Sequence, residues 1–164
     1  MILVLLGTQQ NNFNRLLEEI ESCIEKKEIT EEVIVQAGYT KFSSEKMKIF
    51  DLIPREELEE LISKASLIIT HGGVGSIVMA LKKQKKVIAV PRLSKYEEHV
   101  NDHQIQIVNV FNEKGYIIGI DEVQKLEQAL KKVKEFKPKK YESNTGKIIN
   151  IIENFIKTNI DNKC

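Results

Sequence analysis

LIITHGGVGS, residues 67–76, is the stretch around which the chain is organised. An apolar, β-branched run ends on His71, three glycines follow within four positions, and Ser76 opens a segment of helical composition. This order predicts a buried strand, a tight loop and the N-terminus of a helix. Because a helix start exposes unpaired N–H groups and glycine lets a ligand approach the backbone, the loop suits an anion such as a diphosphate. A glycine-rich turn that serves packing alone is the alternative.

The composition limits the number of domains and the kinds of binding partner that are expected. A chain of 164 residues with 41% hydrophobic residues predicts one domain over residues 1–164. The formal net charge is +1, from 25 basic and 24 acidic residues, so no overall field indicates nucleic acid as a partner. The two distant cysteines, Cys23 and Cys164, argue against a structural zinc site and suit a reducing compartment. The short apolar run at the N-terminus lacks a basic leader, which predicts a cytoplasmic protein without a signal peptide or membrane span.

Strands and helices alternate along the chain. Short apolar runs predict six strands, at residues 2–6, 32–36, 47–50, 67–70, 87–90 and 116–120. Helical periodicity predicts helices after most of them, with Pro54 in the first turn of one, Asp121 as the cap of another, and a last helix over residues 143–158. The expected fold is α/β, a doubly wound, mostly parallel, Rossmann-like sheet of six strands in the order 3-2-1-4-5-6.

That strand order brings two loops together. The crevice at the switch point lies between the first and fourth strands, and ligands bind outside their carboxyl ends. Those ends are Gly7-Thr8-Gln9 and His71-Gly72-Gly73, so their convergence favours the diphosphate interpretation. Neither the G-x-G-x-x-G fingerprint after the first strand nor a P-loop pattern is present, which disfavours NAD binding and P-loop hydrolysis.

A polar segment, YEEHVNDHQ at residues 96–104, leads into a later helix. Its acidic and neutral polar groups suit the hydroxyls of a sugar, each of which donates and accepts, while a solvated helix-entry loop is the alternative. His99 and His103 stand at i and i+4, but the H-E-x-x-H pattern of a metal site is absent. His71 could donate from its imidazole to a phosphate oxygen, or it could simply bond backbone at the strand end.

Taken together, THGGVGSI, VIAVPR and YEEHVNDHQ resemble the glycosyltransferase family 28 C-terminal domain, the nucleotide-sugar half of a GT-B enzyme. The similarity runs from MILVLLGT to the helix after Asp121 and looks closest to the small subunits of split glycosyltransferases. Similar subunits add the second N-acetylglucosamine to dolichol-linked oligosaccharide in eukaryotes and serve capsular and exopolysaccharide assembly in bacteria. In such pairs a second, membrane-associated chain supplies the N-terminal half and binds the lipid-linked acceptor. The resemblance implies no metal or other cofactor.

The resemblance also implies roles for individual residues. Diphosphate contacts are expected from two loops, made of Gly7, Thr8, Gln9 and of His71, Gly72, Gly73, Gly75, Ser76. Contacts to the donor sugar or its phosphates are expected from the residues that match the family's E-H-x-x-D-H-Q pattern, namely Glu98, His99, Asp102, His103 and Gln104. Phe50 would lie near the uracil, Arg92 would help to stabilise the leaving UDP, and His71, Glu98 and His99 are the catalytic candidates. Many relatives hold the ribose with a glutamate where this chain has Met79, a poor hydrogen-bond acceptor.

These expectations describe the catalytic, UDP-sugar-binding subunit of a two-chain inverting glycosyltransferase, recruited by its partner to the inner face of the membrane. Such a reaction needs a base for the acceptor hydroxyl and positive groups or N–H dipoles for the leaving UDP. The chain offers the second set, and by analogy with the fold the base lies on the partner. A non-catalytic nucleotide-sugar-binding subunit is the alternative. A homodimer would be another way to cover the face that a missing half leaves open.

Overall fold

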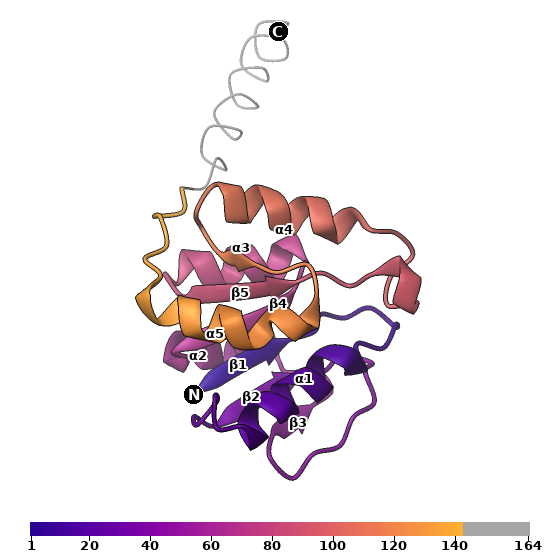
Figure 1. The fold of residues 1–164 in the computed structure, drawn as a ribbon. Helices are drawn as coiled ribbons and strands as arrows, with labels where there is room; N and C mark the ends of the chain where they lie inside the picture. The colour runs from indigo at the N-terminus through magenta and orange to yellow at the C-terminus, as the bar shows by residue number, and fades with distance from the viewer. Residues whose placement is uncertain (143–164) are drawn as a thin grey trace, which may run out of the picture.

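The computed structural model describes residues 1–142 and contains a six-stranded sheet with helices on both faces (Figure 1). The strands are β1 (Ile2–Leu5), β2 (Val33–Gln36), β3 (Lys48–Phe50), β4 (Leu67–His71), β5 (Lys86–Val90) and β6 (Ile118–Gly119). They lie in the order β3-β2-β1-β4-β5-β6, and each neighbouring pair is parallel. The predicted α/β fold and strand order are therefore confirmed.

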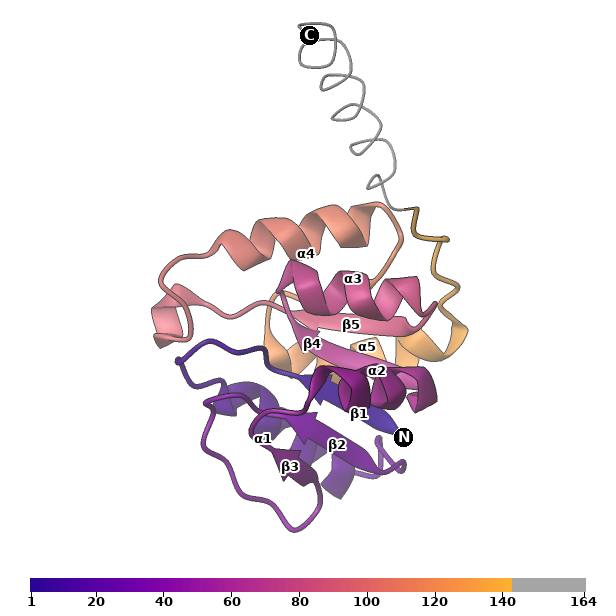
Figure 2. The ribbon, with the colours of Figure 1, turned by 180° about the vertical axis from the view of Figure 1, so that it is seen from behind.

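Within the described residues, five α-helices cover the sheet. They are α1 (Asn14–Glu25), α2 (Arg55–Lys64), α3 (Val74–Lys82), α4 (His103–Glu113) and α5 (Leu126–Glu135), with two 3-10 turns, η1 (Ser94–Tyr96) and η2 (Val123–Lys125). Helices α1 and α5 lie on the face seen in Figure 1, and α2, α3 and α4 on the face seen in Figure 2. Alternate residues of β1 follow this division, because Val4 belongs to the first apolar cluster and Leu3 to the second. Burial on both faces explains the continuous apolar runs of the strands.

Two helix starts differ from the prediction. Helix α3 begins at Val74, with Gly73 in extended conformation as its N-cap, so Ser76 lies inside the first turn and does not cap it. Asp121 does not cap α5, because the turn η2 intervenes and buries Val123 before the helix begins. The Asp121 carboxylate pairs instead with Lys125. The predicted helix over residues 143–158 lies outside the described residues.

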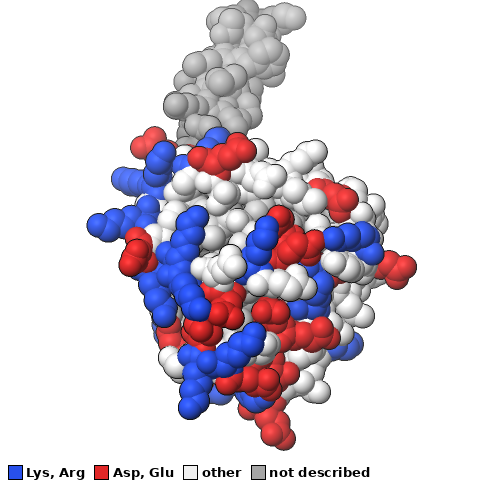
Figure 3. All heavy atoms as spheres, in the orientation of Figure 1, with Lys and Arg blue, Asp and Glu red and all other residues white. Residues whose placement is uncertain are grey.

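Charged side chains of both signs mix over α1 and α5 (Figure 3). Lys131 of α5, for example, pairs with Glu28 and with Glu127. This face therefore carries no field of a single sign, in line with the net charge of +1. None of the helices within residues 1–142 is long and apolar enough to cross a bilayer.

The switch point lies where predicted. Leu5, the last residue of β1, is in register with Gln36 of β2 on one side and with Thr70 of β4 on the other. The loops that follow β1 and β5 meet at the carboxyl edge of the sheet, on the right of Figure 1. This edge carries the glycine loops and the polar segment.

Candidate functional site

The imidazole of His71 lies between the loops that follow β1 and β4. A Cβ atom on Gly7 would lie 2.6 Å from Nε2 of His71, and a Cβ atom on Gly73 would come closer still to the same nitrogen. Gly7 also has a φ of +76°, which side chains other than glycine rarely adopt. Only glycine at both positions leaves room for the ring, so these two glycines and the histidine form one packed unit.

The His71 ring is neutral near pH 7. Its pKa is lowered from 6.5 to about 4, mainly by burial, while a hydrogen bond to Leu5 opposes the shift and the nearby charge of Arg92 adds to it. Nδ1 lies 3.1 Å from the carbonyl oxygen of Leu5, which can only accept, so we assign the proton to Nδ1. Nε2 then presents a lone pair. The imidazole can therefore donate to a phosphate, as predicted, only after it takes up a second proton.

Helix α3 starts directly after this unit. Ile77 N–H is the first in the helix to reach a backbone acceptor, the carbonyl of Gly73 at 3.2 Å. The N–H groups of Val74, Gly75 and Ser76 precede it, and no side chain of the described residues caps this end. A Cβ atom on Gly75 would meet nothing within 4 Å. The first turn of α3 thus offers unpaired donors beneath open space, as an anion site requires.

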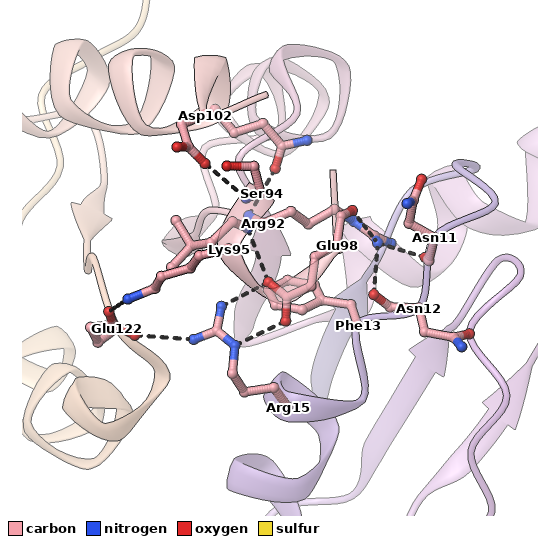
Figure 4. A network of polar contacts seen from close by, with 12 residues as sticks. Asn11, Asn12, Phe13, Arg15, Arg92, Ser94, Lys95, Glu98, Asp102 and Glu122 are labelled. Atoms are coloured by element: carbon pink, nitrogen blue, oxygen red, sulfur yellow. Dashed lines mark hydrogen bonds and ion pairs between the residues drawn. The ribbon is translucent and has the colours of Figure 1, made fainter. Parts of the chain in front are cut away.

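Arg92 lies just after β5 and is buried between the loop that follows β1 and the polar segment that contains Glu98 (Figure 4). The side chain is fully buried, and burial lowers its pKa from 12.5 to about 10, so it stays charged near pH 7. Its guanidinium donates to four backbone carbonyls, those of Asn11 at 2.7 Å, Leu6 at 2.8 Å, Asn12 at 3.3 Å and Glu98 at 3.3 Å. These bonds give Arg92 a structural role, and its contact with the leaving UDP stays a prediction.

Glu98 is also built into the structure. Its side chain is buried, and its carboxylate accepts from Arg15 Nε at 2.9 Å, from Arg15 Nη2 at 2.8 Å and from the backbone N–H of Leu93 at 3.0 Å. Both oxygens are therefore occupied within the chain. This pairing gives Glu98 a structural role, and its catalytic role stays a prediction.

Gln104 is the second buried member of the polar segment. Its Oε1 accepts from the backbone N–H of Arg92 at 3.0 Å, and its Cβ lies 2.7 Å from where a Cβ of Gly72 would be. Gly72 is thus needed for the close approach of α4 to the end of β4. Gln104 therefore anchors the segment to the end of β5, and its contact with the sugar stays a prediction.

The other predicted contacts stay nearer the surface. The hydrogen bond from the backbone N–H of Ser94, at 2.8 Å, lowers the pKa of Asp102. His99 Nδ1 accepts from the backbone of Asn101 at 3.2 Å, and His103 begins α4 with an exposed ring. Within residues 1–142, no three His, Cys, Asp or Glu side chains gather as metal ligands would.

The remaining candidates line the same edge. Thr8 and Gln9 are exposed after β1, and Phe50 is 46% exposed at the end of β3. Met79 lies partly buried against the apolar cluster under α3. The roles of these residues toward a ligand stay predictions.

The comparisons identify the family. The glycosyltransferase family 28 C-terminal domain matches residues 1–159. The chain belongs to this family. Human UDP-N-acetylglucosamine transferase subunit ALG13 is 30% identical over 76 residues, which are 46% of this chain and 6% of that protein. The resemblance seen in the sequence is therefore confirmed, and the chain is a glycosyltransferase domain.

Solved structures share the fold. An NMR structure of ALG13 has a TM-score of 0.55 at 18% identity and covers 92% of this chain and 93% of that one. MurG from Acinetobacter baumannii has a TM-score of 0.57 at 17% identity over 92% of this chain and 49% of its own. UDP-GlcNAc 2-epimerase from Methanocaldococcus jannaschii has a TM-score of 0.59 at 19% identity over 94% and 45%. This family 28 domain thus spans about half of the last two proteins.

Sequence patterns do not single out Arg15 and Asn11. Both follow β1, and both bind the segment that contains Glu98, about 85 residues further along the chain. The one available signal is that Arg15 is the only basic residue of α1, which otherwise carries glutamates. A pairing partner could not be read from that signal.

A pair of glycine substitutions tests the packed unit around His71. Gly73→Ala is expected to lower the free energy of unfolding by about 1–3 kcal/mol, because the new methyl group overlaps the imidazole. Gly75→Ala is the matched control and should leave stability unchanged or raise it by up to about 1 kcal/mol, since its Cβ enters open space on a helix. Urea denaturation of both variants measures the difference. Equal stabilities would show that Gly73 does not confine the ring.

Proposed function

We propose that this family 28 domain is the catalytic, UDP-sugar-binding subunit of a two-chain inverting glycosyltransferase that acts on a lipid-diphosphate-linked acceptor in polysaccharide biosynthesis. One observation carries the proposal: the uncapped start of α3 and the glycine loops around His71 share the carboxyl edge at the switch point. Doubly wound sheets bind ligands at this place, and helix N-termini favour phosphate.

The chemistry supports a role for the chain toward the leaving group. As the bond between sugar and diphosphate breaks, negative charge grows on the UDP oxygen, and the N–H groups of Val74, Gly75 and Ser76 would stabilise it. A bound diphosphate would also favour protonation of His71 at Nε2, which could then donate. Deprotonation of the acceptor needs a base, and the ion pairing of Glu98 supports a base on a second chain.

Two comparisons favour a partner. The human relative is named a subunit of a UDP-N-acetylglucosamine transferase, and the chain spans 49% of MurG. We propose that the second chain supplies the acceptor site and brings the complex to the inner face of the membrane.

Calorimetric titration tests the donor site. The purified chain should bind UDP, UDP-N-acetylglucosamine and UDP-glucose, with ADP at least about tenfold weaker. Gly75→Ala should weaken UDP by about tenfold without loss of stability, because its methyl group fills the space over the first turn of α3. Unchanged UDP affinity in this variant would show that the diphosphate does not bind at the start of α3. Robust transfer by the purified chain alone would contradict the two-chain proposal.

A non-catalytic binding subunit is the second candidate. Met79 in place of a ribose-binding glutamate and the buried state of Glu98 favour it. Such a subunit would bind UDP, yet the two-chain complex would transfer no sugar. His103→Ala separates the candidates further, since reduced transfer by the complex with retained UDP affinity would assign His103 a role in the reaction.

A further inference from the structure

Arg15, in the first turn of α1, bonds to the segments that follow β5 and β6 (Figure 4). Its Nε and Nη2 donate to both carboxylate oxygens of Glu98, and Nη1 donates to Glu122 at 3.3 Å. The guanidinium also lies over the ring of Tyr96, 4.5 Å from its centroid. The side chains of Arg15 and Glu98 are only 15% and 5% exposed, so solvent screens this pair less than a surface pair.

The segment that Arg15 holds, residues 93–102, has internal hydrogen bonds, such as that from the N–H of Ser94 to Asp102, but much of it lies at the surface. Residues 95–97 and 100–102 are exposed. Glu97 has a φ of +58°, a left-handed conformation that costs free energy outside glycine. Its carbonyl accepts from Asn11 Nδ2 at 2.8 Å, and Lys95 pairs with Glu122 at 2.6 Å. Contacts from outside the segment therefore add to its internal hydrogen bonds in holding this conformation.

We infer that Arg15 is a positioning residue, which holds residues 93–102 in the shape that receives the donor sugar. The inference rests on the function proposed above for the same site. Within residues 1–142, the hydrogen bonds of its guanidinium go to Glu98 and Glu122, and none goes to the glycine loops. Arg15 thus acts through Glu98, and His99 follows directly in the chain.

The placement of Arg15 predicts which part of the donor is affected. UDP alone would lie on the glycine loops and the start of α3, which Arg15 does not touch. The sugar would lie on the segment, whose binding-competent shape is populated less when the ion pair is lost. Apparent affinity falls with the fraction of the chain in the binding-competent shape. Loss of Arg15 should therefore weaken the binding of UDP-sugars more than the binding of UDP.

Hydrogen exchange of the ligand-free chain tests the positioning role. In Arg15→Gln, amides of residues 93–102 should exchange about tenfold faster, while those of β1 and β4 keep their protection. Arg55→Gln is the matched control, because Arg55 is an exposed arginine that pairs with Glu59 one turn away. Unchanged exchange in residues 93–102, or a uniform increase over the whole chain, would overturn the inference.

Titration then tests the effect on the sugar. Arg15→Gln should keep UDP affinity within about twofold and reduce the advantage of UDP-N-acetylglucosamine over UDP by about tenfold. An unchanged ratio would overturn the role in sugar placement. Absence of UDP binding to the unsubstituted chain would instead contradict the proposed function, while the exchange experiment, which needs no ligand, would still decide whether Arg15 orders the segment.

A double-mutant cycle tests whether Arg15 acts through Glu98. Glu98→Gln retains an acceptor for Leu93 but removes the charge, so the double variant with Arg15→Gln should exchange no faster than the faster single variant. Additive effects would show that the two residues act separately. Arg15→Lys keeps the charge without the two-pronged geometry and should fall between the unsubstituted chain and Arg15→Gln, which provides a milder variant if the latter folds poorly.

Discussion

Arg92→Leu is expected to lower the free energy of unfolding by about 3–5 kcal/mol, the largest effect of any substitution considered for this chain. The reason is the number of groups that depend on one buried guanidinium. Four backbone carbonyls lose their donor, and the nearby Glu98 carboxylate loses the charge that faces it. Denaturation in urea or guanidinium chloride measures the change.

Two further arginine variants test whether the loss of stability is specific to the buried guanidinium of Arg92. Arg55→Leu removes an exposed guanidinium and should change stability by no more than about 0.5 kcal/mol. Arg92→Lys retains the charge but offers one compact donor centre in place of a fork. Its loss of stability should therefore lie between those of Arg55→Leu and Arg92→Leu. If Arg92→Lys instead kept full stability and lost only UDP affinity, Arg92 would reach the ligand as the resemblance implied, and the structural role would be refuted.

Arg92, Glu98 and Gln104 show which features of the candidate site can be predicted from the sequence and which cannot. The family pattern picks out a segment at the carboxyl edge of the sheet, but a ligand contact and a buried anchor are compatible with the same residue types. The choice depends on which side of the loop each side chain faces. For Glu98 it depends on Arg15, a partner 83 residues away in sequence. No short-range pattern in the sequence indicates that Arg15 and Glu98 pair.

The order of the strands was predictable because it follows from alternation along the chain. Parallel strands need crossovers, each crossover places the next strand beside an earlier one, and burial on both faces leaves continuous apolar runs. The start of α3 was less predictable. Ser76 is a residue type favoured at N-caps, yet the extended backbone of Gly73 begins the helix three residues earlier, at the close approach to His71.

His71 is expected to make the chain less stable as the pH falls from 7 to about 4. Its pKa is about 4 in the folded chain against 6.5 for an unburied ring, so the unfolded state takes up the proton first. Stability therefore rises with pH across this window, is fully present above about pH 6.5, and is lost as the pH approaches the folded value. The shift corresponds to a loss of up to about 3 kcal/mol, at 1.36 kcal/mol for each pKa unit.

Carboxylates also titrate in this range, so the contribution of His71 is the difference between two profiles. His71→Gln keeps a polar side chain but cannot take up the proton, and its unfolding free energy should fall less steeply between pH 7 and about pH 4. His103→Gln is the control, because its exposed ring is solvated in both states and the steep profile should remain. Parallel profiles for His71→Gln and the unsubstituted chain would mean that the ring is not held neutral between Gly7 and Gly73. Its Nε2 would then take up the proton that donation to a diphosphate requires at a higher pH than a buried ring would.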